Sequence, residues 1–131
     1  MESYFAPEEL RCKCGRLECD ALTAVEPMLL NHLNYLRARI KRPIMVTSAL
    51  RCVFWNRRNG GEADSEHLIG CAADLSVADN RERWELVTNI ISPTTLFNRV
   101  WIGDTFVHVD IARRHDLFAM GTYYRRKVDV G

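Results

Sequence analysis

The chain has 131 residues, enough for one domain with a buried core. Hydrophobic residues make up 47% and charged residues 27%, as in an ordinary soluble globular protein. With 18 basic and 17 acidic side chains the formal net charge is +1, so we expect neither nucleic acid nor an anionic membrane as a partner. We expect no integral membrane segment and no secretory signal, and therefore synthesis in a cytoplasm, as a monomer.

The first third of the chain predicts mainly helix. A short helical turn at residues 7–10 leads into a cysteine-rich loop, and together they form an amino-terminal extension over residues 1–22. Apolar residues at helical spacing predict a long helix over residues 23–40, and Thr23 with Glu26 resembles a capping box at its start. A β-branched strand is predicted over residues 44–47, and a short helix over residues 50–57.

The remainder predicts strands with one further helix. Residues 72–77 read as a strand, and a helix begins at Asn80 and stops before Pro93. Two late strands, at residues 99–102 and 105–111, are separated by Gly103-Asp104, which suggests a tight hairpin turn. The sequence therefore predicts a single compact α+β domain, with a central antiparallel sheet flanked by helices and a catalytic core over residues 23–115.

His67, Asp74 and His108 form the most informative pattern in the chain. Two histidines and one carboxylate can hold zinc with a fourth position free for water, whereas structural zinc sites are closed by four ligands, usually cysteine-rich. Gly70 suggests a bend that would let His67 and Asp74 converge. Strand alternation places His108 and Asp110 on one face.

The two other histidines, His32 and His115, have no partner motif, and we expect no ligand role for either.

Residues 65–74 together with His108-Val109-Asp110 resemble the zinc peptidases that cut D-alanyl bonds in bacterial cell walls. That group includes D-Ala-D-Ala carboxypeptidases, vancomycin-resistance dipeptidases and phage L-alanyl-D-glutamate endolysins, and the amino-terminal signalling domain of hedgehog proteins shares their fold. Residues 42–51, Asn56 and the Gly60-Gly61 pair extend the resemblance over roughly residues 4–113.

The resemblance implies one catalytic Zn²⁺ with His67, Asp74 and His108 as its ligands. It also implies that Arg51 holds the substrate carbonyl, or the oxyanion that develops from it, by charge. Ser65 could hydrogen-bond the substrate, although a hydroxyl that stabilises the loop explains it almost as well.

The general base is where the sequence departs from many relatives, which place an acid three residues before the last histidine. Thr105 stands there and has no useful basicity. Asp110 lies on the same strand face as His108, so we expect it to act as base or to orient the attacking water. Asp104 is the second candidate for the general base.

Five cysteines are present, and three of them, Cys12, Cys14 and Cys19, crowd into one loop. A second, structural zinc would need a fourth ligand, which Cys52 or Cys71 could supply only through a tertiary contact. Free thiols are the favoured interpretation, with Cys71 as a packing residue.

These patterns predict a zinc metallopeptidase that hydrolyses an amide bond in peptidoglycan stem peptides or crosslinks, of the D-Ala-D-Ala or L-Ala-D-Glu type. A phage lysis protein, synthesised in the cytoplasm and then released onto the cell wall, fits the expected absence of a secretory signal. An intracellular dipeptidase is the enzymatic alternative. A metal-binding module of the same fold without catalysis remains open, because of Thr105.

Overall fold

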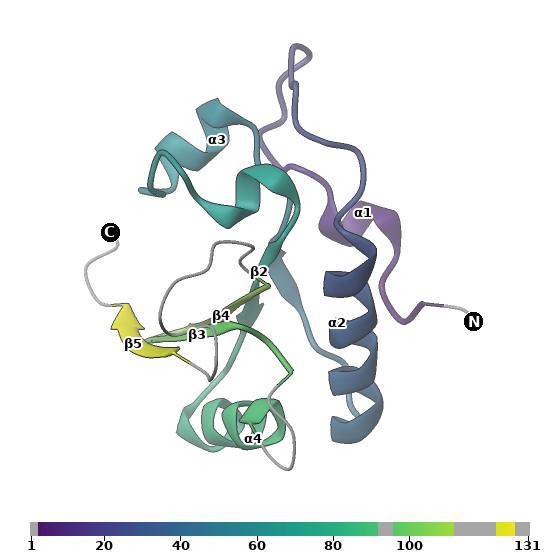
Figure 1. Cartoon of the computed structure of the whole chain (residues 1–131), viewed down its shortest axis with the longest axis vertical. Coiled ribbons are helices and arrows are strands. Elements are labelled where there is room, and N and C mark those ends of the chain that lie inside the picture. The colour runs from purple at the N-terminus through teal and green to yellow at the C-terminus, as the bar shows by residue number, and fades with distance from the viewer. Residues whose placement is uncertain (1–2, 92–95, 112–122, 128–131) are drawn as a thin grey trace.

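A five-stranded sheet organises the molecule (Figure 1). The computed structural model describes residues 3–91 and 96–111, and the backbone of residues 123–127. The strands are β1 (Val46–Ser48), β2 (Ala72–Ser76), β3 (Arg99–Gly103), β4 (Phe106–Asp110) and β5 (Tyr123–Lys127), in the spatial order β1-β2-β4-β3-β5. The first four run antiparallel, which confirms the predicted α+β class, and β5 joins parallel to β3.

Within the described residues, four α-helices and one 3₁₀ turn accompany the sheet. They are α1 (Pro7–Leu10), α2 (Pro27–Ile40), α3 (Val53–Arg58), the 3₁₀ turn η1 (Glu66–Ile69) and α4 (Asn80–Ile91). The helix α4 spans the residues that its sequence pattern predicts, while β1 and α3 begin two or three residues later than expected. The predicted end of the catalytic core at residue 115, together with His115, lies outside the described residues.

The long helix α2 begins at Pro27, so the predicted start at Thr23 with a capping box was wrong. Proline suits the first helical position because it has no N–H to satisfy and its φ is already helical. The backbone N–H of the preceding residue, Glu26, donates to the carbonyl oxygen of Gly70 at 2.9 Å, which holds the chain extended up to this point. At the other end, Lys41 adopts a left-handed conformation and caps the helix.

The two faces of the sheet differ in chemistry because side chains alternate along each strand. On one face, Ala73, Leu75, Val107 and Val109 are fully buried. They form one hydrophobic core with the buried residues of α2 and α4: Leu29, Leu33, Leu36, Leu86, Val87 and Ile90. The opposite face carries Asp74, His108 and Asp110. The apolar face thus anchors the helices and leaves the other face for polar chemistry.

Over the described part of the chain, none of the helices combines the length and the apolar character that crossing a bilayer requires.

Candidate metal centre

His67 lies on η1, a short 3₁₀ turn that leads into β2. The Ser65 hydroxyl accepts a hydrogen bond from the His67 backbone N–H at 3.2 Å and caps the turn. The turn ends at Gly70 in a left-handed conformation, with φ of 76°. A Cβ at Gly70 would lie 3.3 Å from the Cα atom of Val25. The predicted bend at Gly70 is confirmed, and it allows η1 to fold back over the strand that follows.

Asp74 on β2 lies directly opposite His108 on β4 in the antiparallel register. Side chains of directly opposed residues lie on the same face of the sheet. His67 approaches the pair from η1, and one donor atom from each of the three residues lies within 4.8 Å of the others. All three residues are buried. The structure thus brings together the three residues for which zinc ligation is predicted.

The hydrogen bonds of His67 determine which of its ring nitrogens faces the cluster. Nδ1 lies 2.7 Å from the carbonyl oxygen of Ala49, and because a carbonyl can only accept, Nδ1 carries the proton. Burial lowers the pKa of His67, which favours the neutral ring. Nε2 is therefore unprotonated and buried, 3.4 Å from Oδ1 of Asp74, and it has no hydrogen-bond partner among the described residues. A lone pair held in this way by a bond at the other nitrogen is the form in which histidine binds a metal.

His108 lies between two carboxylates. Its Nδ1 is 2.9 Å from Oδ1 of Asp74, and its Nε2 is 2.8 Å from Oδ2 of Asp110. Burial alone would lower the pKa of His108, but hydrogen bonds to Asp110 and Asp74 raise it above its usual value. Likewise, burial would raise the pKa of Asp74, whereas its interaction with the neighbouring His67 ring and the hydrogen bond from His108 lower that pKa well below its usual range.

Arg51, two residues before the start of α3, fixes the orientation of Asp74. Its Nη2 donates to Oδ2 of Asp74 at 3.1 Å, which leaves Oδ1 toward the two histidines. Its Nε donates to Ser48 at 2.9 Å and its Nη1 to Asn56 at 3.0 Å. A Cβ on Gly61 would overlap Oδ1 of Asn56, which explains the glycine here. These residues form an arginine clamp, comprising Arg51, Ser48, Asn56 and Gly61, behind the cluster.

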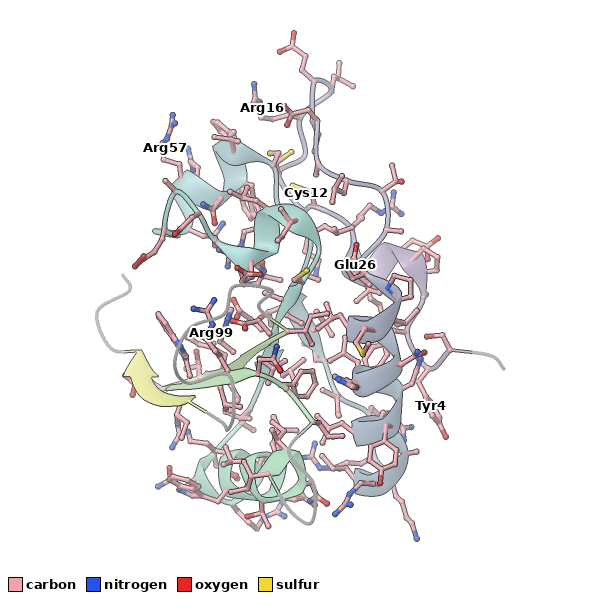
Figure 2. All side chains as sticks on the ribbon, viewed as in Figure 1. Tyr4, Cys12, Arg16, Glu26, Arg57 and Arg99 are labelled. Atoms are coloured by element: carbon pink, nitrogen blue, oxygen red, sulfur yellow. The ribbon has the colours of Figure 1, made fainter. Side chains whose placement is uncertain are left out.

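Asp110 is fully buried and accepts hydrogen bonds from two side chains. Besides the bond from His108, its carboxylate oxygens lie 3.1 and 3.2 Å from Nε of Arg99. Arg99 also lies 3.9 Å from the carboxylate of Glu66, which is buried beside His67. Figure 2 places Arg99 toward the middle of the molecule, whereas Arg57 projects at its periphery. Arg99 and Glu66 thus belong to the surroundings of the site, and the sequence pattern did not single them out.

The sequence nevertheless contained a signal for Arg99. Once the hairpin of β3 and β4 pairs Ile102 with Val107, the same register pairs Arg99 with Asp110. An arginine directly opposite a buried carboxylate is the partner that this charge requires.

Asp104, the second candidate for the base, lies with Thr105 in the turn between β3 and β4. Thr105 is exposed, and its carbonyl oxygen accepts from the backbone N–H of Val77 at 3.0 Å. Asp104, beside it, is also exposed. Of the acidic residues predicted as base, Asp110 is therefore the one in contact with His108.

Comparison with known proteins identifies the family. A family model described as Peptidase M15 matches residues 3–110, most of the chain and all of the clustered residues. The chain belongs to the peptidase M15 family. M15 proteins are metallopeptidases, so a metal-dependent peptidase is the class to which this chain is assigned. No curated protein matches the sequence.

The clustered residues fit a catalytic zinc ion of an M15 metallopeptidase. Two imidazole nitrogens and one carboxylate oxygen are the donor types that catalytic zinc sites use, with the fourth position left to water or substrate. His67 has an orphaned, unprotonated nitrogen aimed at the other two donors. A buried polar atom without a partner is costly, and a metal ion would satisfy it.

Proposed function

We propose that the chain is a zinc-dependent peptidase that hydrolyses an amide bond in peptidoglycan stem peptides or crosslinks. Membership of the M15 family supports a peptidase for peptidoglycan-type substrates. The observation that best supports zinc binding is the lone pair on Nε2 of His67. This nitrogen is buried, has no hydrogen-bond partner among the described residues, and is directed at Asp74 and His108. The D-Ala-D-Ala and L-Ala-D-Glu bonds are the proposed targets.

In this proposal His67, Asp74 and His108 would hold the ion. When bound, zinc supplies a Lewis acid that polarises the scissile carbonyl and lowers the pKa of water toward about 7. Arg51 keeps Asp74 turned toward the histidines through the bond at Oδ2. Its guanidinium has five N–H donors, and its bonds to Ser48, Asn56 and Asp74 use three of them, so donors remain for a substrate carbonyl oxygen.

We propose that the main role of Asp110 is to orient His108. Its Oδ2 accepts from Nε2 of His108, so the histidine would face the ion through Nδ1, beside Asp74. A carboxylate behind a ligating histidine fixes the ring orientation and raises its basicity. The pKa of Asp110 itself is lowered by the bonds from His108 and Arg99, which outweigh the opposing effect of burial. A lowered pKa weakens Asp110 as a proton acceptor, and this favours the positioning role over the role of base.

The proposal is tested with purified peptidoglycan and defined stem peptides, and the released fragments are identified by mass. We expect the wild-type chain to release fragments, His67→Ala to release none, and His32→Gln, a histidine outside the cluster, to behave as wild type. The fragment masses name the bond. A folded, zinc-loaded wild type that leaves every stem peptide intact would contradict the proposal.

That negative outcome would favour the second candidate, a metal-binding module without catalysis. The observation that supports this candidate is the position of Asp110, which is fully buried with its carboxylate already engaged by His108 and Arg99. Thr105 stands where many relatives carry an acid. Binding of the inactive chain to peptidoglycan, measured by co-sedimentation, would then define its function.

Action on the cell wall after release from the cytoplasm, as in phage lysis, is part of the same proposal. Lysis of cells by the enzyme added from outside, set against no lysis when it is expressed alone in the cytoplasm, is the expected pattern.

A further inference from the structure

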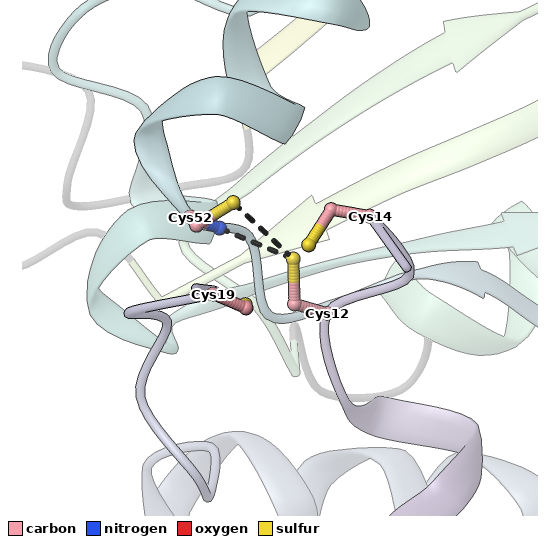
Figure 3. Close-up of side chains that lie close together, drawn as sticks. All are labelled: Cys12, Cys14, Cys19 and Cys52. Carbon is pink, nitrogen blue, oxygen red and sulfur yellow. Dashed lines mark hydrogen bonds between the residues drawn. The ribbon is translucent and has the colours of Figure 1, made fainter. Parts of the chain in front are cut away.

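Four cysteines meet at the amino-terminal end of α3 (Figure 3). Cys12, Cys14 and Cys19 come from the loop between α1 and α2, and Cys52 is the residue before α3. Their sulfur atoms all lie within 4.8 Å of one another, and each is a free cysteine. We call this group the four-cysteine cluster. The fifth cysteine, Cys71, is fully buried in the hydrophobic core and does not belong to it.

The spacing of the sulfurs suits tetrahedral coordination. A Zn–S bond of about 2.3 Å implies about 3.8 Å between two sulfurs on one tetrahedron. The sulfurs of Cys12 and Cys52 lie 3.7 Å apart, although 40 residues separate them in the chain. With all four sulfurs within 4.8 Å of one another, the cluster supplies the four cysteine ligands of a closed structural zinc site.

Backbone N–H groups point at three of the four sulfurs. Cys12 accepts from the backbone N–H of Cys52 at 3.3 Å, and Cys14 accepts from that of Arg16 at 3.3 Å. Cys52 accepts from the backbone N–H of Trp55 at 3.4 Å, as the N-cap of α3. Donors aimed at sulfur stabilise the negative charge of a thiolate, which is the form that binds metal.

Basic residues surround the same loop. Arg11, Lys13 and Arg16 alternate with the cysteines along the chain. Zinc with four thiolates carries a net charge of about −2, which nearby cations offset. The guanidinium of Arg16 lies 4.2 Å above the ring of Phe54 on α3, the helix that Cys52 caps.

We propose that the four-cysteine cluster binds a second zinc ion, which has a structural role and is separate from the histidine site. The loop at residues 11–26 contains neither helix nor strand, so little backbone bonding orders it. A metal bound by the cluster would join this loop to the start of α3. Because Cys52 directly follows Arg51, the ion would also fix the backbone beside the arginine clamp.

The experiment is a zinc count on the purified full chain, by elemental analysis, with variants that separate the two sites. We expect two zinc ions in the wild type and one in Cys14→Ser and in Cys19→Ser. Cys71→Ala, a cysteine outside the cluster, is the matched control and should keep both ions. His67→Ala should lose one ion and keep the other, so failure of the histidine site does not count as failure of the cluster.

Cobalt(II) substitution gives a second readout, which does not depend on activity. Binding to the cluster should produce thiolate-to-cobalt charge-transfer absorption in the wild type and in His67→Ala, and Cys14→Ser should lose it. Absence of this absorption in the wild type, or an unchanged zinc count in Cys14→Ser and Cys19→Ser, would overturn the proposal.

Discussion

The buried pair of Arg99 and Asp110 gives the sharpest test of how this site is held together. Substitution of Arg99 by methionine keeps the length and apolar stem of the side chain, and removes the cation that faces Asp110 at 3.1 Å. Asp110 would remain fully buried and would keep its hydrogen bond to His108. Breaking a buried ion pair on one side costs about 3–5 kcal/mol. Because the Arg99 side chain is 21% exposed, we expect the lower end, about 3 kcal/mol.

Arg42→Met, the same substitution in a more exposed ion pair, provides the control. Arg42 and Glu85 form an ion pair at 2.8 Å, with side chains that are 30% and 34% exposed. Exposed pairs contribute about 0–1 kcal/mol, so Arg42→Met should cost no more than about 1 kcal/mol.

Urea unfolding of both variants at one fixed zinc concentration measures the difference. In thermal unfolding, a loss of about 3 kcal/mol would lower the Tm of a chain of this size by roughly 10 °C. Adding Asp110→Asn to Arg99→Met should recover part of the loss, because the buried negative charge that Arg99 offsets is then absent. If Arg99→Met costs no more than Arg42→Met, the buried ion pair does not stabilise the site as we reason.

Local patterns in the sequence predicted most of the fold. The helix α4 and the hairpin of β3 and β4 lie where periodicity and turn residues place them. Strand alternation also predicted the shared face of His108 and Asp110, which now hydrogen-bond. These features depend on neighbours within a few residues, so the sequence specifies them directly.

What the sequence did not predict depends on long-range contact. The meeting of Cys12 and Cys52 requires the amino-terminal loop to pack against α3, 40 residues away. The bond of Glu26 to Gly70 likewise joins distant segments and sets where α2 begins. No local periodicity encodes such contacts. The parallel pairing of β5 with β3 is another long-range contact that the sequence pattern did not predict.

Three further predictions address metal affinity, the arginine clamp and pH. Asp110→Asn should weaken zinc binding at the histidine site about 10–100-fold, measured by competition with a chelator, because His108 loses its charged partner. Gly61→Ala should lower peptidase activity while circular dichroism stays unchanged, because the new Cβ displaces Asn56 from the clamp, and unchanged activity would contradict this role. Burial lowers the pKa of His32, so the folded chain resists protonation of this ring. The stability that the neutral ring contributes is therefore complete above the unfolded pKa of about 6.5, and is lost as pH falls below it, because the unfolded chain then binds the proton more readily. His32→Gln should flatten the stability profile below about pH 6.5 in urea titrations, and a parallel fall in both proteins would assign the acid sensitivity to other groups.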